Sequence, residues 1–416
     1  MSILVQKFGG SSLATVEQLR RVAGRVAAAH RAQRPVVVVV SARGRTTDVL
    51  LELTHALNTR PQAREIDQLL STGESSSAAQ LAMALDELGV PAASLTGCQV
   101  GVHVSGPHGA GRIDRIDASR VRALLRKGFV PVVSGFQGVN DDGDVVTLGR
   151  GGSDTTAVAL AAELGAERCE IYTDVDGVFT ADPRVVPTAR MLSSVDCRMM
   201  AEMARSGAKV LHYRSVELAS SREVEVYIRN SSKSDPGTVL VRKGGAPVES
   251  RGSIVAVTHD ADTVEISIFS DQVDPVLLPE VLDRLADVGI ETDLFTLTSD
   301  GERHAVRFTV THSGLSHTRA VLAASDLASS YTMCVDETLG KVSLIGSHPA
   351  VNPAHSARML RTLAAAGIRA VSVYTAPMQI SVLVPKPQLT ASVSALHTAF
   401  GLGVLPESAA ALGSGW

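Results

Sequence analysis

The sequence predicts an α/β protein: an N-terminal three-layer αβα sandwich around a mainly parallel sheet, followed by two small α+β units. In the first part, apolar β-branched runs such as residues 36–40 alternate with stretches of helical periodicity such as residues 15–31. That order of strand, loop and helix is typical of a parallel sheet with helices on both faces. The second part contains an internal repeat with a constant offset of 78 residues, which relates Val264 to Val342 and Gly289 to Gly367.

Size and composition exclude several classes of protein. The 416 residues are enough for two or three domains, and the apolar fraction of 45% is enough for a full core. A net charge of −4 gives no electrostatic case for nucleic acid binding. The apolar run at 36–40 is too short to span a membrane, and the N-terminus shows no signal peptide pattern. Four widely spaced cysteines fit a reducing compartment, so we expect a cytoplasmic protein without a membrane partner.

The expected elements follow from periodicity and from turn residues. In the N-terminal part the expected strands are residues 3–8, 36–40, 91–95, 130–134, 170–173 and 225–229. The expected helices are residues 15–31, a helix from 49, a helix from 65 that breaks at 71–74 and resumes at 78–88, residues 157–164 and residues 202–210. Expected turns lie at 106–111 and 140–144.

The repeat units define the expected domain boundaries. Each unit reads as strand, helix, strand and second strand, the last at residues 304–310 and 379–384. We expect a first domain at 1–245, a linker at 242–252, and repeat domains at 260–335 and 340–410, with a strand near 253–259 joining the last.

Residues 147–184 combine a glycine loop that leads into a helix with an acidic loop that also contains glycine. Gly149, Gly151 and Gly152 would let another molecule approach the backbone, and Ser153 and Asp154 are suitable N-caps for the helix that follows. The start of a helix offers unpaired N–H groups to an anion. Lys7 and Ser41 each end a predicted strand, where open α/β sheets bind their ligands, and this places them in the same cleft.

Six ordered blocks carry a family resemblance. They are Lys7-Phe8-Gly9-Gly10-Ser11-Ser12, Ser41-Ala42 with Thr46-Thr47-Asp48, Gly73-Glu74, residues 149–154, residues 173–184 and residues 207–212. This set resembles the motifs of the aspartokinases, within the amino acid kinase superfamily, over residues 1 to about 240. The repeats resemble a tandem pair of ferredoxin-like ACT domains, which sense amino acids in that family.

The resemblance implies phosphorylation of the β-carboxylate of L-aspartate by ATP, with Mg²⁺ carried by the nucleotide and no metal ligands from the protein. It also implies amino-acid effectors at the ACT units, and a homodimer or higher homo-oligomer formed through them. A carboxylate nucleophile is ionised at pH 7, so the site needs cations and N–H donors more than a base.

The resemblance also implies residue roles. Lys7 would contact the transferring phosphate together with the Gly9 and Gly10 N–H groups, Glu74 the substrate ammonium, and Arg150 the α-carboxylate. The expected catalytic residues are Lys7, Arg150 and Asp154. The expected substrate-binding residues are Ser41, Thr47, Glu74, Arg150, Gly151, Gly152, Ser153 and Asp154. The expected nucleotide-binding residues are Lys7, Phe8, Gly9, Gly10, Thr173, Asp174, Phe179, Arg184, Lys209 and Val210.

Alternatives stay open at this stage. Lys7, Glu74 and Asp174 also fit solvated surface residues, and Arg150 fits an ion pair with Asp154 that closes its own loop. The whole chain also fits another amino acid kinase with a different acid substrate, or a non-catalytic regulatory protein that responds to amino acids.

The sensor half departs from the family pattern. The Asp-x-Pro-Gly expected after the first strand is replaced within residues 270–276, and the usual Gln-Asn pair is replaced by Thr296-Leu297-Thr298. That glycine exposes backbone N–H groups, so its loss removes the natural clamp for an amino acid carboxylate. We therefore expect feedback inhibition by threonine and lysine to be weakened or absent.

Overall fold

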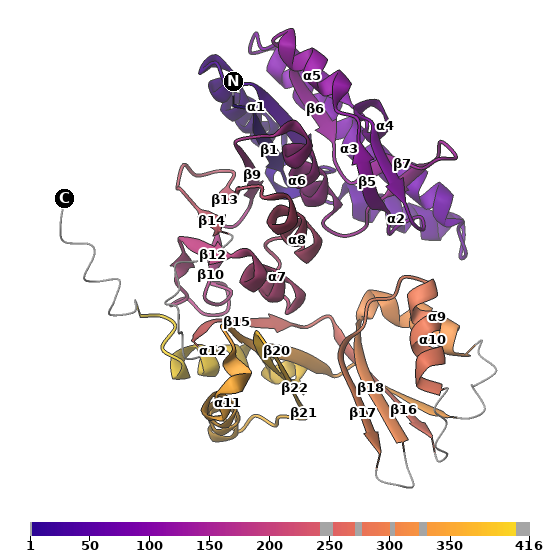
Figure 1. Cartoon of the computed structure of the whole chain (residues 1–416), viewed down its shortest axis with the longest axis vertical. Coiled ribbons are helices and arrows are strands. Elements are labelled where there is room, and N and C mark those ends of the chain that lie inside the picture. The colour runs from indigo at the N-terminus through magenta and orange to yellow at the C-terminus, as the bar shows by residue number, and fades with distance from the viewer. Residues whose placement is uncertain (1, 242–252, 271–276, 300–303, 324–330, 405–416) are drawn as a thin grey trace, which may run out of the picture. The chain divides into compact units, whose positions relative to one another are not determined.

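The computed structural model describes residues 2–241, 253–270, 277–299, 304–323 and 331–404 (Figure 1). Two compact units divide the chain. Unit 1 comprises Met1–Val178, Met191–Arg205 and Lys209–Pro247, and unit 2 comprises Phe179–Arg190, Ser206–Ala208 and Val248–Trp416. None of the helices in the described ranges is long and apolar enough to cross a membrane.

An eight-stranded, mainly parallel sheet forms the centre of unit 1, as predicted. Its strand order is β12-β14-β13-β9-β1-β2-β6-β3, and the antiparallel pair is β13 with β14. The strands are β1 (Leu4–Phe8), β2 (Val36–Val40), β3 (Ala92–Leu95), β6 (Val130–Ser134), β9 (Arg168–Thr173), β12 (Ser194–Asp196), β13 (Val226–Asn230) and β14 (Thr238–Val241).

Helices cover both faces of this sheet, which explains why β2 is a continuous run of buried valines. On one face, α1 (Val16–Arg31) and α3 (Ala63–Asp86) pack their apolar sides against Phe8, Val38 and Val132. On the other face, α6 (Gly152–Leu164) contacts β1, β2 and β9, and α8 (Tyr213–Arg222) packs on α6. The three-layer αβα prediction is therefore confirmed.

A smaller sheet of order β5-β4-β7-β8 completes unit 1. The β7–β8 hairpin turns at residues 140–144 as predicted, because Asn140 exchanges hydrogen bonds with Asp144 and Gly143 has a φ of +84°. The remaining elements are α2 (Thr46–Leu57), α4 (Gly97–Val100), β4 (Val102–Ser105), β5 (Arg112–Ile116), α5 (Ser119–Arg126), β7 (Gln137–Val139), β8 (Val145–Thr147), β10 (Val178–Phe179), β11 (Met191–Leu192) and α7 (Cys197–Arg205).

The predicted break at residues 71–74 is wrong, because α3 runs through it without interruption. The hydroxyls of Ser71, Ser75 and Ser77 each donate to a carbonyl three or four residues earlier, so they do not compete with the helix. Gly73 is required by packing: a Cβ there would lie 2.9 Å from the Ala42 side chain. Tertiary contact outweighs the low helix propensity of this stretch.

Two helix boundaries also differ from the prediction. The helix expected from residue 49 begins at Thr46, which places Thr47 in its first turn. The helix expected at 202–210 ends at Arg205, because Gly207 adopts a φ of +103° and its backbone approaches the His259 carbonyl too closely for a side chain.

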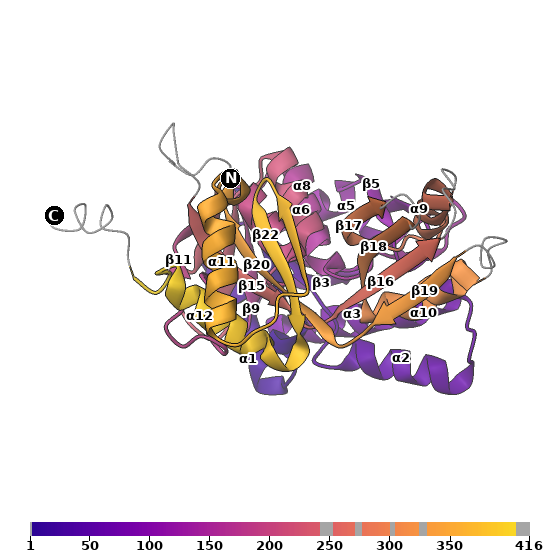
Figure 2. The same cartoon turned by 90° about the horizontal axis from the view of Figure 1, so that it is seen from below.

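Two four-stranded antiparallel sheets form the described part of unit 2, in the orders β17-β18-β16-β19 and β15-β20-β22-β21 (Figure 2). The first contains β16 (Thr263–Ser270), α9 (Leu277–Asp287), β17 (Asp293–Ser299), β18 (His304–Thr311), α10 (His312–Ala323) and β19 (Thr332–Asp336). The second contains β15 (Ile254–Asp260), β20 (Leu339–Gly346), α11 (Pro353–Ala365), β21 (Ser372–Ala376), β22 (Gln379–Pro385) and α12 (Leu389–Ala399).

Each sheet packs against two helices of its own, α9 and α10 on the first sheet and α11 and α12 on the second. The predicted pair of antiparallel α+β units is confirmed, and each unit includes one helix and one strand more than the repeat pattern predicted. β15 supplies the extra strand of the second unit by pairing with β20. The expected linker at 242–252 lies outside the described residues, and the domain boundaries stay predictions.

Candidate active site

The candidate site lies at the carboxyl ends of β1 and β2, where their loops interlock. Ser41 N–H donates to the Phe8 carbonyl at 3.1 Å, and Gly44 N–H donates to the Gly10 carbonyl at 2.9 Å. A Cβ on Gly10 would lie 2.5 Å from the Ala42 carbonyl oxygen, so only glycine allows this contact. The two strand-end loops identified from sequence are thus held side by side.

One amide at this end of the sheet already has a partner. Gly9 N–H donates to the Tyr172 carbonyl at 3.1 Å. The expectation that Gly9 N–H binds phosphate therefore does not hold for this conformation, and Gly10 is the remaining candidate of the pair. The Phe8 ring is buried and stacks on Tyr172, with ring centroids 4.8 Å apart. Phe8 therefore packs in the core next to the site.

Lys7 and Asp154 form the central ion pair of the site. The Lys7 Nζ lies 2.5 Å from the Asp154 Oδ1, and each side chain is only 10% exposed. Asp154 therefore does not pair with Arg150, and the loop-closing pair considered from sequence is not formed. A solvated surface lysine is likewise excluded for Lys7. The ammonium also lies beside the Gly9 backbone, since a Cβ on that glycine would be 3.6 Å from it.

Asp154 belongs to the first turn of α6, but it does not cap the helix. The N-cap residue is Gly151, with a φ of +68°, and Ser153 and Asp154 follow inside the helix. A Cβ on Gly151 would lie 2.0 Å from the His212 Cβ, so the loop passes directly against α8. The capping prediction for Ser153 and Asp154 is wrong, because Gly151 takes the N-cap position in the left-handed region, two residues before Ser153.

Glu74 is buried on α3 and faces the end of β2. Its Oε1 accepts a hydrogen bond from Ala42 N–H at 3.0 Å, whereas its Oε2 is buried without a hydrogen-bond partner among the described residues. Burial raises the pKa of Glu74 from 4.5 to about 7, against the opposing effect of the Ala42 hydrogen bond. A solvated turn carboxylate is therefore excluded, and one oxygen remains for a cationic partner.

The other expected substrate-binding residues are more open. Arg150 is exposed, and its side chain makes no ion pair or hydrogen bond with another described residue. Ser41 and Thr47 are partly buried beside the β2 loop, whereas Ser153 is buried against Gly135, where a Cβ would lie 2.8 Å from the Ser153 hydroxyl. Gly152 is closed in by Leu148 and Phe136.

The expected nucleotide-binding residues fall into two groups. Thr173 and Asp174 lie in unit 1 at the end of β9, where the Thr173 hydroxyl donates to Asp174 at 3.0 Å and Asn230 donates to the Asp174 carbonyl at 3.3 Å. Lys209 and Val210 follow α7 in the same unit, and Lys209 is exposed.

Phe179 and Arg184 belong to unit 2, so the structure does not place them relative to Lys7. Arg184 pairs with Asp182 at 2.7 Å on the surface. Their segment is anchored in unit 2, because Ala181 and Val186 join the apolar core below α12, and Thr180 contacts His397 at 3.0 Å.

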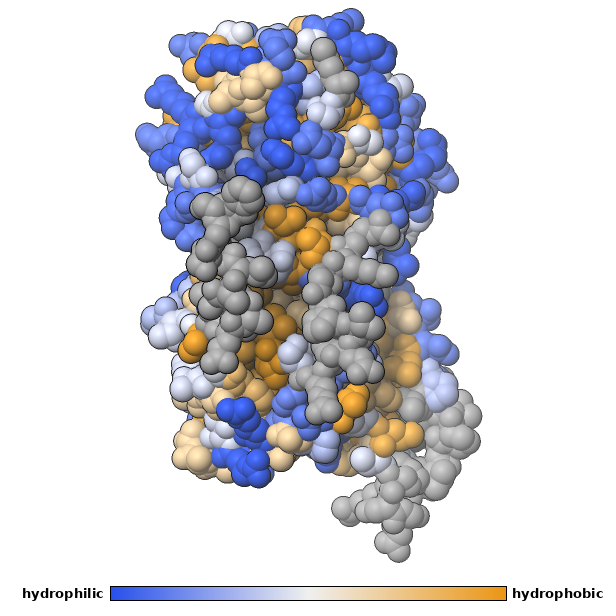
Figure 3. Space-filling model, turned by 60° about the vertical axis from the view of Figure 1, so that its left-hand side comes forward, coloured by the Kyte–Doolittle hydropathy of each residue, from blue (hydrophilic) through white to orange (hydrophobic). Residues whose placement is uncertain are grey.

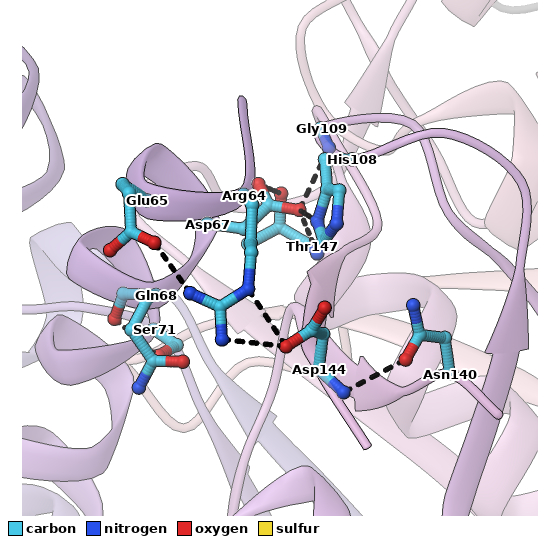
Figure 4. Close-up of polar contacts among 10 residues, drawn as sticks. All are labelled: Arg64, Glu65, Asp67, Gln68, Ser71, His108, Gly109, Asn140, Asp144 and Thr147. Atoms are coloured by element: carbon cyan, nitrogen blue, oxygen red, sulfur yellow. Dashed lines mark hydrogen bonds and ion pairs between the residues drawn. The ribbon is translucent and has the colours of Figure 1, made fainter. Parts of the chain in front are cut away.

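Sequence reasoning missed two polar residues near the site, the buried Asp67 and the partly buried Arg214. Asp67 accepts hydrogen bonds from Thr147, immediately before the glycine loop (Figure 4). Arg214 donates to the Leu148 carbonyl at 2.6 Å. A signal for Asp67 did exist: it precedes Glu74 by seven residues, which is two helical turns. The predicted helix break between them concealed that shared face.

Comparisons with known proteins identify the family. Residues 2–230 match the amino acid kinase family model, and residues 342–400 match an ACT domain model. Aspartokinase from Mycolicibacterium smegmatis is 43% identical to this chain, with full coverage of both.

Solved structures agree. Aspartokinase III of E. coli in complex with aspartate and ADP matches with a TM-score of 0.80 at 25% identity, over 95% of this chain and 99% of that one. The same enzyme in complex with lysine and aspartate matches with a TM-score of 0.71, over 96% and 99%. Since both the family model and a full-length relative match, this chain belongs to the aspartokinases of the amino acid kinase family.

Proposed function

We propose that this enzyme transfers the γ-phosphoryl group of ATP to the β-carboxylate of L-aspartate, giving 4-phospho-L-aspartate and ADP. The observation that supports this most is the buried Lys7–Asp154 pair at the strand ends, beside a buried Glu74 with one unused oxygen. Aspartate and ADP in the similar E. coli aspartokinase III support the same substrates here.

The transfer step needs charge neutralisation more than acid–base chemistry. A β-carboxylate oxygen attacks the γ-phosphorus, a new P–O bond forms, and the bond to the ADP oxygen breaks. We assign Lys7 to the oxygens of the transferring phosphoryl group, with Gly10 N–H as a second donor. Asp154 holds the Lys7 ammonium at the end of β1 and supplies the counter-charge that offsets the cost of burying it.

The substrate amino acid carries three charged groups that need separate partners. We assign its ammonium to the Glu74 Oε2 and its α-carboxylate to Arg150, whose guanidinium is exposed and suited to bidentate binding. The loop at Gly151, Gly152 and Ser153 borders this position, as do Ser41 and Thr47.

The nucleotide would be bound by the remaining residues predicted from sequence. In unit 1 these are Thr173, Asp174, Lys209 and Val210, since Phe8 is buried on Tyr172 and Gly9 N–H already has a partner, and Phe179 and Arg184 belong to unit 2. Mg²⁺ enters as part of the ATP substrate. An ion that arrives with ATP would be bound mainly by phosphate oxygens and water.

A hydroxamate assay tests the proposed reaction. The purified chain is incubated with ATP, Mg²⁺, hydroxylamine and one acid from a panel containing aspartate, glutamate, N-acetylglutamate and carbamate. Hydroxamate formed with aspartate in clear preference supports the proposal. Turnover with another acid would assign a different amino acid kinase activity, and no turnover with any acid would favour a regulatory protein.

We also propose that feedback inhibition by threonine and lysine is weakened. Residues 296–298 read Thr-Leu-Thr on β17, and the lost Asp-x-Pro-Gly falls on residues 270–276, of which 271–276 lie outside the described residues. Without the clamp of backbone N–H groups, effector binding supplies little coupling energy. Threonine and lysine, at roughly 1 mM each, should lower the aspartate-dependent rate by less than about twofold. Half-inhibition at submillimolar concentrations would contradict this.

We propose a homodimer or higher homo-oligomer formed through unit 2. The edge strands β17 and β21 carry exposed apolar side chains, with Leu297 55% and Val373 44% exposed, and apolar patches lie on the surface of unit 2 in Figure 3. Leu297→Lys combined with Val373→Lys should halve the mass measured by light scattering. The matched control Val351→Lys, at a 77% exposed position off the strands, should keep the wild-type mass. An unchanged mass for the double variant would contradict this interface.

A further inference from the structure

Asp67 is a buried carboxylate that joins three separate segments of unit 1. Its side chain is 1% exposed on α3, and it accepts four hydrogen bonds (Figure 4). The Oδ2 accepts from Thr147 N–H at 2.9 Å, from Gly109 N–H at 2.9 Å and from the His108 Nδ1 at 3.1 Å, and the Oδ1 accepts from the Thr147 hydroxyl at 2.6 Å. Such a group is costly to bury and therefore strongly favours the geometry that satisfies it.

The same face of α3 reaches the substrate-binding residues. Asp67 and Glu74 are two helical turns apart, about 10 Å along the axis. Between them, the Ser71 carbonyl accepts a hydrogen bond from the buried Gln137 amide at 2.9 Å. Because α3 is one continuous helix, it fixes the position of Glu74 relative to the segments that Asp67 binds.

Asp67 binds the start of the glycine loop. Thr147 is followed by Leu148, whose carbonyl accepts from Arg214 at 2.6 Å, and the Thr147 carbonyl accepts from Gly111 N–H at 2.9 Å. The next residue, Gly149, has a φ of +73° and lies so close to the Gly109 carbonyl that a Cβ would be 2.8 Å from it. The loop that carries Arg150 and leads to Asp154 is thus held by the segments that Asp67 joins.

We propose that Asp67 is a positioning residue for aspartate binding: it sets the separation between Glu74 on α3 and the loop that carries Arg150. This inference rests on the proposed function, in which those two residues bind opposite charges of one small substrate. The ammonium and α-carboxylate of an amino acid are separated by a fixed covalent distance, so a shift of the loop by a fraction of an ångström weakens one contact or the other.

Asp67→Asn tests the proposal. The amide keeps the size of the side chain but turns an N–H₂ group towards donors that need an acceptor. The KM for aspartate should rise about 10- to 30-fold. The KM for ATP should stay within about twofold of the wild-type value, because the residues expected to bind ATP do not depend on the distance between Glu74 and Arg150.

Two variants of Thr147 test the same contact with a smaller change. Thr147→Val removes only the 2.6 Å side-chain bond to Asp67 and should raise the KM for aspartate about threefold to tenfold. Thr147→Ser restores the hydroxyl and should return the KM to near the wild-type value. If Asp67→Asn fails to fold, the Thr147 pair decides the question.

A neighbouring contact supplies the matched control. Arg64 donates to Asp144 at 2.8 Å and also joins α3 to the β7–β8 hairpin, but on the surface, with the two side chains 48% and 25% exposed (Figure 4). Asp144→Asn should leave both KM values unchanged.

The outcomes separate the two proposals. A wild-type enzyme without aspartate-dependent turnover removes the proposed function. An active wild type whose folded Asp67→Asn and Thr147→Val variants keep the wild-type KM for aspartate overturns the positioning role. The KM for aspartate and the KM for ATP rising in parallel would also overturn it, because a purely structural loss affects both substrates.

Discussion

Replacing Lys7 by alanine is expected to lower the aspartate-dependent kcat by about 10³-fold. The ammonium is buried and held by a carboxylate at 2.5 Å, so it is preorganised for the charge that spreads over the transferring phosphoryl group. The rate is measured by coupling ADP release to a chromogenic reaction at saturating aspartate and ATP. Lys127→Ala, at an exposed lysine following α5, is the matched control and should keep the wild-type kcat.

The same variant should destabilise the fold, because it leaves the Asp154 carboxylate buried without its partner. We expect a loss of about 3 kcal/mol in the free energy of unfolding. Adding Asp154→Asn to Lys7→Ala removes the orphaned charge and should recover part of that loss while the kcat stays low. If kcat recovers together with stability in the double variant, Lys7 only balances charge and its catalytic role is wrong.

The second large effect concerns Glu74 and pH. An ionised Glu74 is needed to bind the substrate ammonium, and burial raises its pKa to about 7. The kcat/KM for aspartate should therefore rise about tenfold per pH unit below 7 and level off above it. Glu74→Gln should raise the KM for aspartate about 10²-fold and abolish this dependence. A wild-type profile that is flat between pH 5.5 and about 8 would contradict the assignment.

Stability should change in the opposite direction. The folded protein binds the Glu74 proton more tightly than the unfolded chain does, so the free energy of unfolding falls as pH rises from 4.5 to about 7 and is unaffected by this group outside that window. Over this pH window the free energy of unfolding should fall by about 3 kcal/mol. Denaturant titration of the substrate-free enzyme should show Glu74→Gln to be more stable than wild type at pH 8 and equal to it below pH 4.5. If Glu74→Gln is instead less stable than wild type at pH 8, the hydrogen bond from Ala42 N–H to the carboxylate outweighs the cost of burying its charge.

The strand order and the repeats were predictable because they depend on residue periodicity. Residues 36–40 can only be a doubly covered strand, and the matching glycines at 289 and 367 mark the same turn in both repeats. The strand-end position of Lys7 followed from the same pattern. Local propensity failed at Gly73 and at the start of α6, where Gly151 takes the N-cap position, and the deciding contacts come from Ala42 and His212, far away in the sequence.

The charged residues of the site could be predicted from the sequence, whereas the ion pairs between them could not. Sequence placed Lys7, Glu74 and Asp154 together through motif resemblance, but the ion pair it offered for Asp154, as an alternative, was with Arg150. The Lys7–Asp154 pair depends on how α6 meets β1, which only the folded chain specifies. The hydrogen bond from Gly9 N–H to the Tyr172 carbonyl and the four bonds of Asp67 are of the same kind, since each joins residues 41 to 163 positions apart.

A crystal structure of the enzyme with ADP and L-aspartate tests the central claim most directly. We predict the aspartate ammonium within hydrogen-bonding distance of the Glu74 Oε2, its α-carboxylate on Arg150, and its β-carboxylate directed past Lys7 towards the terminal phosphate of ADP. Aspartate bound away from Glu74 and Arg150, or ADP phosphates distant from Lys7, would contradict the account.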